Sequence, residues 1–386
     1  MSQPANFGFG SEEQMVRDAA AKFLKDTLPV DRLRALVAGN HVDAYESDVQ
    51  PVAWDEGHWA RCVELGWTAL AVPETAGGAE LPWIAVATLA EEAGRAALPS
   101  PLQSTLAATA VLRAALNCGC SAGTRALERI ASGTAAALAT SGVTGDWDCD
   151  GVDVCATEHN GSIKLSGSAY FVQDARKVAF FVVAANEGDG IGLFIVAADA
   201  PGLTIVPDRI TDLTRDQAVV RFDSVETEAG ARVATADTGA RVLAAATPAI
   251  LTVLAADMVG AAEWQLQTTA EYARVRKQFG HEIGFFQAVK HPIVNMMIDI
   301  DRARSLVYAA ACAQDKDPTN AARLAHMAKA AASDMAAFCA SRSVQLHGGI
   351  GFTWECDVHI WFKRQKHSQM LYGDGAWHRA KLAEFY

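Results

Sequence analysis

Two long helical patterns joined by a short charged turn, at residues 272–287, constrain the fold of this chain more than any other stretch. The first pattern ends in three cations within four residues, which suit the negative end of a helix dipole. Phe279 and Gly280 follow as a turn, because glycine supplies the backbone freedom that a chain reversal needs. A second helix is expected from Gln287. A helix end and a turn explain the cations, but not the spacing of Phe279 and Gln287 from Arg276.

Long helical patterns after residue 241 predict a C-terminal helical bundle over residues 241–386. Thr247 and Pro248 are of the types preferred at an N-cap and a first helical position, so the first long helix is expected to begin there. Trp354 and Trp361, seven residues apart, are expected on one packed face of a later helix. The predicted helices cover residues 249–274, 287–314, 320–346, 355–371 and 375–385.

The region before the bundle divides into a helical part and a β part. Residues 1–132 carry helical periodicity throughout, beginning with an expected capping box between Ser11 and Gln14. From residue 133 to about 240, short β-branched runs alternate with Gly, Asp and Asn, which predicts a small antiparallel barrel or sandwich. The expected fold is therefore α+β, mainly α, in three domains. The apolar stripe of the first helix is predicted at Met15, Ala19, Phe23 and Leu24.

Composition excludes several classes of function. The 386 residues carry a net charge of −12 without long single-sign blocks, which disfavours nucleic acid and anionic membranes as partners. No apolar run of about 18 residues and no signal-like N-terminus is present. Eight scattered cysteines predict free thiols in a reducing cytoplasm. Cys118 and Cys120 are the one close pair, and they lack the further ligands of a zinc site, so no metal is expected.

The turn at residues 272–287 closely resembles the Arg-x-x-Phe-Gly…Gln signature of the acyl-CoA dehydrogenases, flavoproteins that oxidise the Cα–Cβ bond of acyl-CoA thioesters. A second family segment, Gln345-Leu-His-Gly-Gly-Ile-Gly, follows about sixty residues later. The resemblance covers nearly the whole chain. It implies that Arg276, Phe279 and Gln287 reach across a dimer interface to the FAD of a neighbouring subunit. It also implies that Gln345, Gly348 and Gly349 bring backbone close to that cofactor.

Oxidation of a Cα–Cβ bond needs a flavin for the hydride, a carboxylate for the Cα proton and fixed donors for the thioester oxygen. The wall of the flavin ring departs from the family pattern. The family's Thr-Glu-Pro-Gly-x-Gly-Ser-Asp stretch is replaced here by residues 140–147, a poor match. The family's Trp and Thr that contact the ring correspond to Phe171 and Gln173. Phe171 keeps the capacity to stack on a ring, while the small hydroxyl is gone.

The catalytic base is the largest departure. The family carries a Glu either in a Tyr-Glu-Gly-Thr motif or on the helix before the Arg-x-x-Phe segment. Gly373 stands directly after Tyr372 here, and Ile250 occupies the second position. Asp374 comes one residue later in the chain, and its side chain is shorter than that of the family's Glu. It is a candidate base, or it is the N-cap of the last helix, and the cap is the favoured interpretation.

Residues offered to a neighbour's FAD are kept, whereas residues of the chain's own site are degraded. This pattern predicts one subunit of a heteromeric acyl-CoA dehydrogenase, in which a partner chain supplies the ring pocket and the catalytic Glu. The C-terminal Gly-Asp-x-x-x-His-Arg run is similar to α2β2 enzymes acting on CoA thioesters of steroid side chains. An electron-transferring flavoprotein is the expected electron acceptor. The alternatives are a self-sufficient homotetramer with Asp374 as base, a flavoprotein of related oxygen chemistry, and a non-catalytic scaffold on the same fold.

Overall fold

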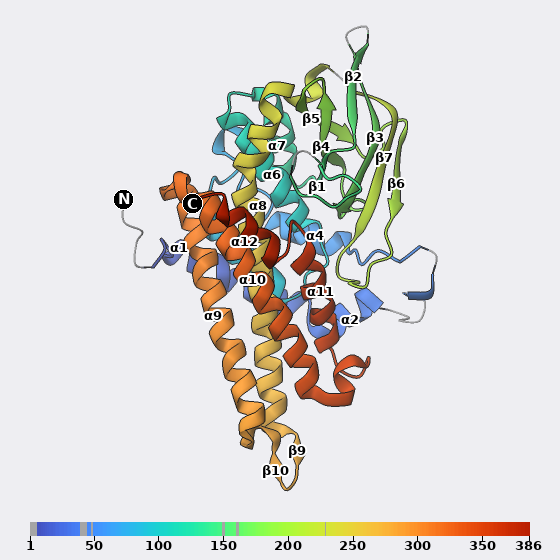
Figure 1. The fold of residues 1–386 in the computed structure, drawn as a ribbon. Coiled ribbons are helices and arrows are strands. Elements are labelled where there is room, and N and C mark those ends of the chain that lie inside the picture. The colour runs from blue at the N-terminus through green and yellow to red at the C-terminus, as the bar shows by residue number, and fades with distance from the viewer. Residues whose placement is uncertain (1–5, 39–44, 48, 149–150, 160–161, 228) are drawn as a thin grey trace.

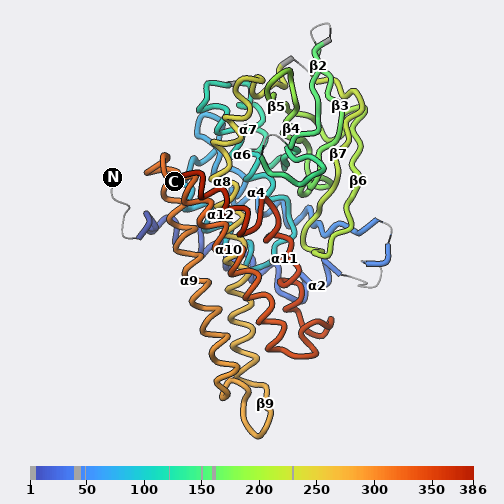
Figure 2. The backbone as a smooth tube through the Cα atoms, in the orientation of Figure 1, coloured from blue at the N-terminus to red at the C-terminus, as the bar shows by residue number. Residues whose placement is uncertain are grey.

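The computed structural model describes residues 6–38, 45–47, 49–148, 151–159, 162–227 and 229–386. A sheet lies at one end of the molecule and three long helices extend to the opposite end, with the first amino-terminal helices beside the middle of the molecule (Figure 1). The hairpin of β9 (Lys277–Gln278) and β10 (His281–Glu282) forms the tip farthest from the sheet, as the backbone trace of Figure 2 also shows. This arrangement confirms the expected α+β class with helical N- and C-terminal parts.

The described part of the N-terminal region is helical, as predicted for residues 1–132. The first helix begins differently from the expectation, because Gly10 is its N-cap and the Gly10 N–H donates to Glu13 Oε2 at 2.8 Å. Met15 and Ala19 are exposed, while Ala20 and Leu24 are buried. The predicted capping box and half of the predicted stripe were therefore wrong. The described helices are α1 Ser11–Thr27, α2 Val30–Ala38, α4 Glu56–Glu64, α5 Trp83–Arg95, α6 Leu102–Asn117 and α7 Thr124–Ala131.

The middle of the chain forms one eight-stranded sheet in the order β6-β7-β3-β2-β4-β5-β8, with β1 paired to β4. Most pairs are antiparallel, but β1 and β2 both run parallel to β4, which differs from the purely antiparallel expectation. Successive residues of β4 alternate between two buried clusters, one shared with the helices and one enclosed by the sheet. The strands are β1 Ala136–Ala139, β2 Cys155–His159, β3 Ser162–Gln173, β4 Phe180–Glu187, β5 Gly190–Ala197, β6 Leu203–Pro207, β7 Gln217–Thr227 and β8 Arg232–Ala234.

The long helix α8 begins well before the predicted start at Thr247 and Pro248. It spans Ala236–Val275 and contains Pro248 in its interior. Gly239 lets α8 rest directly on β5, because a Cβ there would lie 1.9 Å from the Ile191 carbonyl oxygen. This contact holds the first turns of the helix in place, so Pro248 removes one backbone hydrogen bond without ending it. The expected domain boundary at residue 241 falls inside α8.

The remaining bundle elements agree with the predicted stretches to within a few residues. Trp354 precedes α11, so the prediction that it shares a helix face with Trp361 was wrong; the ring of Trp361 stacks instead on Trp264 of α8, with 3.5 Å between centroids. The elements are α9 Gln287–Lys316, α10 Pro318–His347, α11 Val358–Met370 and α12 Gly375–Ala383, with the short strands β9 Lys277–Gln278 and β10 His281–Glu282 after α8.

Helices α5 and α8 cross at very short range. A Cβ added at Gly94 would lie 1.9 Å from the Asp257 carbonyl oxygen, and one at Gly260 would lie 1.7 Å from the Glu91 carbonyl oxygen. Backbones this close require glycine at both positions. By length and composition α8 could cross a membrane, but 72% of the relevant window is buried inside the protein. That burial is typical of the core helix of a globular fold.

Candidate functional site

The residues of the 272–287 turn lie at the exposed tip of the long helices. Arg276 ends α8, Phe279 sits in the hairpin between β9 and β10, and Gln287 begins α9. All three are exposed, and Phe279 is 89% exposed. Phe279 also has a φ of 53°, in the left-handed region that bulky residues rarely adopt. A large apolar side chain presented outward in this way is typical of a surface that another molecule covers.

The second family segment lies beside the first. The Tyr272 ring of α8 stacks on the His347 ring at the end of α10, with 4.4 Å between centroids. The Tyr272 hydroxyl also donates to the His347 carbonyl oxygen at 3.4 Å. Gln345, Gly348 and Gly349 are exposed just beyond this contact. The fold thus brings the two segments onto neighbouring ends of α8 and α10.

The two glycines of the second segment are not needed for packing inside this chain. A Cβ added at Gly348 or Gly349 would meet nothing within 4 Å. Gly348 has a φ of 67°, which favours glycine, whereas Gly349 carries no such constraint. Open space over a bare backbone suits the close approach of a ligand or of another chain. These residues fit the expected role at a cofactor held mainly by a neighbour.

Arg276 is a cation of the tip that is available to bind an anion. Within the described part of the chain its guanidinium has no hydrogen-bond or ion-pair partner. The neighbouring cations are paired: Arg274 lies 3.2 Å from Glu271, and Lys277 lies 3.3 Å from Glu282. A planar, permanently charged fork with five donors matches phosphate oxygens. We call the surface formed by Arg276, Phe279, Gln287, Gln345, Gly348 and Gly349 the donor patch.

The side chains at the positions expected to wall this chain's own flavin ring contact one another and their neighbours. Phe171 lies in a β-bulge of β3 with a φ of 55°, and its ring packs 5.9 Å from that of Trp147. Trp147 also packs 5.1 Å from the Tyr372 ring. Gln173 donates to Gln217 Oε1 at 2.9 Å, and its own Oε1 lies 3.0 Å from His367 Nε2. These contacts occupy the Phe171 ring and the Gln173 amide, which a flavin ring would otherwise contact.

Little space remains on one side of Gln173 and Tyr372. The cavity bordered by Gln173, Ile250 and Tyr372 has a volume of about 10 Å³, enough for about one water molecule. Ligand pockets usually span roughly 300–1,000 Å³. This cavity is therefore too small for a flavin ring or an acyl chain. A larger cavity of about 290 Å³ is bordered by Thr140, Ser141 and Trp147 of the expected ring wall and by Ile250 and Tyr372, between the sheet, α8, α10 and α12.

The loop that would carry the base is held by a buried lysine. Lys329 Nζ donates to the Gly373 carbonyl oxygen at 2.7 Å, to the Gln369 carbonyl oxygen at 3.2 Å and to Ser333 Oγ at 3.0 Å. Burial lowers the pKa of Lys329 to about 7, against a smaller opposing effect of Asp374. Asp374 Oδ1 accepts from the Trp377 N–H at 2.8 Å, so Asp374 is the N-cap of α12. This is the favoured of its two predicted roles.

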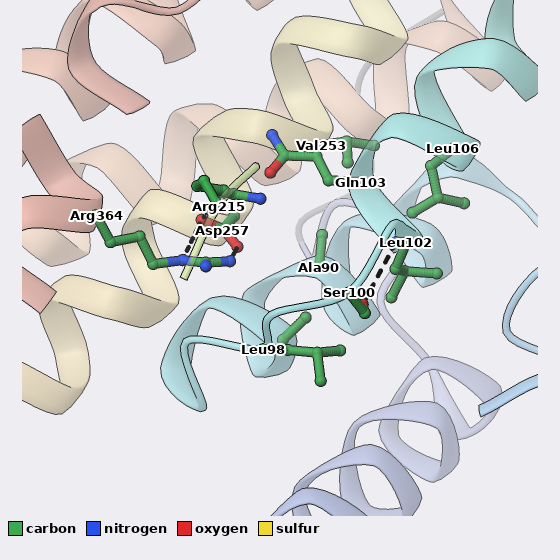
Figure 3. Close-up of a pocket in the computed structure, with 11 residues that line it drawn as sticks. Ala90, Leu98, Ser100, Leu102, Gln103, Leu106, Arg215, Val253, Asp257 and Arg364 are labelled. Carbon is green, nitrogen blue, oxygen red and sulfur yellow. Dashed lines mark hydrogen bonds and ion pairs between the residues drawn. The ribbon is translucent and has the colours of Figure 1, made fainter. Parts of the chain in front are cut away.

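Sequence reasoning missed a buried cluster of charged residues next to the cavity of about 10 Å³. Asp257 of α8 pairs with Arg364 of α11 at 2.5 Å and with Arg215 of the β6–β7 loop at 2.9 Å (Figure 3). The signal in the sequence was the position of Asp257 in a long uncharged stretch, because a buried charge needs a partner of opposite sign. Burial opposes ionisation of Asp257, but the two guanidiniums outweigh it and hold its pKa below the ordinary value.

The chain resembles known proteins along most of its length. Family models described as the N-terminal and C-terminal domains of acyl-CoA dehydrogenase match residues 10–134 and 238–386. Acyl-CoA dehydrogenase IpdE2 of Mycobacterium tuberculosis is 34% identical over 361 residues, covering 93% of this chain and 92% of that protein. The solved structure of a steroid ACAD variant, Tcur3481-Tcur3483, is 28% identical with a TM-score of 0.84 and covers 97% of each chain. The ChsE4-ChsE5 complex of Mycobacterium tuberculosis shares the fold, with a TM-score of 0.83 at 22% identity and 98% coverage of both chains.

Proposed function

Because this chain belongs to the acyl-CoA dehydrogenase family, we propose that it is the subunit of a heteromeric enzyme that completes the FAD site of a homologous partner chain. The reaction of that enzyme is the Cα–Cβ desaturation of an acyl-CoA thioester. The observation that carries the proposal is the contrast between the exposed donor patch and the chain's own base positions, where Gly373 and Ile250 carry no carboxylate and Asp374 caps α12. A homodimer would need both halves intact in one chain.

The donor patch supports a role at the tail of the cofactor. Arg276 has the free guanidinium for a pyrophosphate, Phe279 the exposed ring for the adenosine side, and Gln287 an exposed amide at the start of α9. The exposed backbone of Gly348 and Gly349 leaves room for close approach. When bound, the FAD supplies the hydride acceptor of the reaction. The residues of this chain bind and orient it from outside the partner's ring pocket.

The chemistry at the substrate is assigned to the partner chain. Gly373 and Ile250 carry no carboxylate, and the Asp374 carboxylate already caps α12. A carboxylate used as a helix cap is held by a backbone N–H, which favours its ionised form but fixes its direction. The general base that removes the Cα proton is therefore a Glu of the homologous subunit. The self-sufficient homotetramer that would use Asp374 finds no support in this geometry.

The substrate class follows from the relatives by analogy. A CoA thioester carrying a steroid side chain is the substrate we propose, because a steroid ACAD is among the structures most similar in sequence. Electrons would leave to an electron-transferring flavoprotein, as is usual for the family. A cytoplasmic location suits the seven cysteines of the described residues, which are all free thiols.

The test is the flavin content of this chain alone and of its complex with a homologous dehydrogenase chain. We expect little FAD on the chain alone and about one FAD per pair in the complex, read by absorbance. Arg276→Ala in this chain should lower FAD affinity of the complex at least tenfold, since a charge-assisted contact is lost. Arg274→Ala is the matched control, because Arg274 is a neighbouring cation already paired with Glu271. One FAD per chain in the isolated protein, or no effect of Arg276→Ala, would overturn the proposal.

A further inference from the structure

The open cavity of about 290 Å³ has walls that are mostly apolar and aromatic. Ligand pockets usually span roughly 300–1,000 Å³, so a cavity at the lower end of that range suits a molecule of one or two rings. Aromatic side chains on several sides favour a ligand that itself carries a ring, because ring faces and edges pack well together. The apolar and aromatic wall includes Leu243, Ile250, Leu251, Trp147, Tyr372 and Trp377.

The charged side chains of the cavity pair with one another at its mouth. Lys381 Nζ lies 2.6 Å from Asp148 Oδ2 and 3.3 Å from Glu384 Oε1. The Asp148 and Glu384 side chains are 42% and 66% exposed, so this group faces solvent. Among the described residues that border the cavity, Lys381 is the only cation with a permanent charge near neutral pH. The interior therefore favours an uncharged ligand, because a buried charge without a partner is costly.

One polar ring of the wall is held in a defined orientation. His326 of α10 borders the cavity, and its Nδ1 lies 2.8 Å from Nδ1 of His378 of α12. The His326 ring also packs against Trp377 and Phe385, with 6.0 and 6.1 Å between centroids. Both imidazoles are buried, and His378 is 0% exposed. The bond between them fixes which edge of His326 remains for the cavity.

The histidine pair also defines which nitrogens carry a proton. Burial lowers the pKa of both rings, and burial with the nearby Lys329 and His326 lowers that of His378 to about 3, so both are neutral near pH 7. A neutral imidazole has one N–H and one acceptor nitrogen. Nε2 of His378 makes no hydrogen bond within the described residues, but the carbonyl groups of Tyr372 and Gly373 lie near enough to raise the pKa of this ring. A nitrogen beside carbonyl oxygens is more stable as N–H than as a lone pair, so Nδ1 of His378 is the acceptor.

It follows that His326 donates through Nδ1 and keeps a lone pair on Nε2. Nε2 of His326 makes no hydrogen bond to any described residue, and unlike Nε2 of His378 it is not a buried unpaired atom. Because His326 borders the cavity, this acceptor is available to a molecule inside it. The cavity thus combines apolar and aromatic walls with an acceptor of fixed orientation.

We propose that this cavity binds a small, uncharged, ring-containing alcohol whose hydroxyl donates to Nε2 of His326. The ring of the ligand packs against Trp147, Tyr372 and Trp377, and the paired charges of the mouth leave no unpaired cation for an anionic ligand. The inference goes beyond the proposed function and does not depend on it, because binding requires neither FAD nor a partner chain.

Equilibrium dialysis of the isolated chain tests the proposal with two probes of similar shape, 2-naphthol and 2-methylnaphthalene. The second carries a methyl group in place of the hydroxyl and cannot donate. We expect one 2-naphthol per chain, and a ratio of the two affinities that changes at least fivefold against 2-naphthol in His326→Leu, because a hydrogen bond is lost. His359→Leu is the matched control, since His359 is a buried imidazole outside the residues that border the cavity. An unchanged ratio in His326→Leu would overturn the role of His326.

A second variant tests the place of binding and leaves the histidine pair intact. Ala322 borders the cavity from α10 and is only partly buried. Ala322→Phe should fill the cavity and weaken 2-naphthol binding at least tenfold. Undiminished binding would show that the probe occupies another part of the surface, and the proposal would be wrong.

Two further measurements test the acceptor and the class of ligand. Long-range ¹H–¹⁵N NMR spectra of the imidazoles should show Nε2 of His326 unprotonated, with a ¹⁵N shift that moves when 2-naphthol is added. A protonated Nε2 would overturn the proposed hydrogen bond. Displacement of 2-naphthol by butyryl-CoA would assign the cavity to a thioester and overturn the proposed class of ligand.

Discussion

Asp374 accepts a hydrogen bond from the Trp377 N–H and begins the last helix. Asparagine is as good an N-cap as aspartate but cannot accept a proton as a base. We therefore expect Asp374→Asn to keep the turnover of the heteromeric complex within about twofold and the stability within about 0.5 kcal/mol. Asp374→Ala should lose about 1 kcal/mol of stability, with the same turnover per folded complex. A loss of turnover by more than a hundredfold in Asp374→Asn would instead identify Asp374 as the base.

Lys329 makes stability depend on pH in an unusual direction. Its pKa falls from 10.5 in the unfolded chain to about 7 in the fold because of burial. The unfolded chain therefore binds more protons between about pH 7 and 10.5, so this residue makes the free energy of unfolding rise with pH across that window. The penalty is fully present below about pH 7. The rise is at most about 1.4 kcal/mol per pH unit.

Urea unfolding of the wild type and of Lys329→Met between pH 7 and 9.5 measures this effect. The difference in free energy of unfolding between the two proteins should change with pH, in favour of the wild type as pH rises. Lys381→Met is the control, because Lys381 lies nearer the surface and is paired with Asp148 at 2.6 Å. A difference that stays constant across the window would show that the Lys329 amine keeps an ordinary pKa.

At the scale of elements, the crossing of α5 and α8 sets the shape of the helical core. Gly260→Ala would place a methyl group 1.7 Å from the Glu91 carbonyl oxygen, so the two helices must separate. Alanine usually stabilises a helix by up to about 1 kcal/mol relative to glycine. Backbone overpacking outweighs that gain, and we expect a net loss of about 1–3 kcal/mol, seen as a lower thermal midpoint. Gly230→Ala, where a Cβ meets nothing within 4 Å, should change the midpoint little.

At the scale of the whole molecule, the donor patch lies at the end farthest from the sheet (Figure 1). Phe279→Asp changes an 89% exposed side chain, so the isolated chain should keep its stability within about 0.5 kcal/mol. The same change should weaken association with the partner chain at least tenfold, because a charge replaces an apolar contact in a covered surface. Analytical ultracentrifugation of the mixed chains measures it.

Met15→Asp is the matched control for that experiment. Met15 is also an exposed apolar residue, at 64%, but it lies on α1, away from the donor patch. It should leave association unchanged. Equal weakening by both substitutions would point to a general effect of charge and remove the case for the patch as an interface.

Periodicity and turn chemistry predicted the kind and order of most elements, because they depend on neighbours in sequence. The long helices of the bundle appear near their expected places, and strands β1 to β8 lie within the predicted β region. The predictions that were wrong share a cause, which is packing against elements distant in sequence. Pro248 has the local features of a helix start, but the packing of Gly239 on β5 extends α8 past it. Met15 has helical spacing, but the neighbouring helices cover the adjacent face of α1, so Ala20 is buried instead.

The sequence by itself determined the family and the fold class, helical at both ends with a sheet between, because these depend on short motifs and local periodicity. The roles of the donor-patch residues stay a prediction. The sequence also showed that Gly373 and Ile250 carry no carboxylate. Only the tertiary structure decided that Asp374 caps a helix and that Arg215, Asp257 and Arg364 meet beside a cavity of about 10 Å³. These three charged residues are separated by tens of residues in sequence and come from three different elements. Their pairing is set by how the sheet, α8 and α11 pack together, which no local pattern encodes.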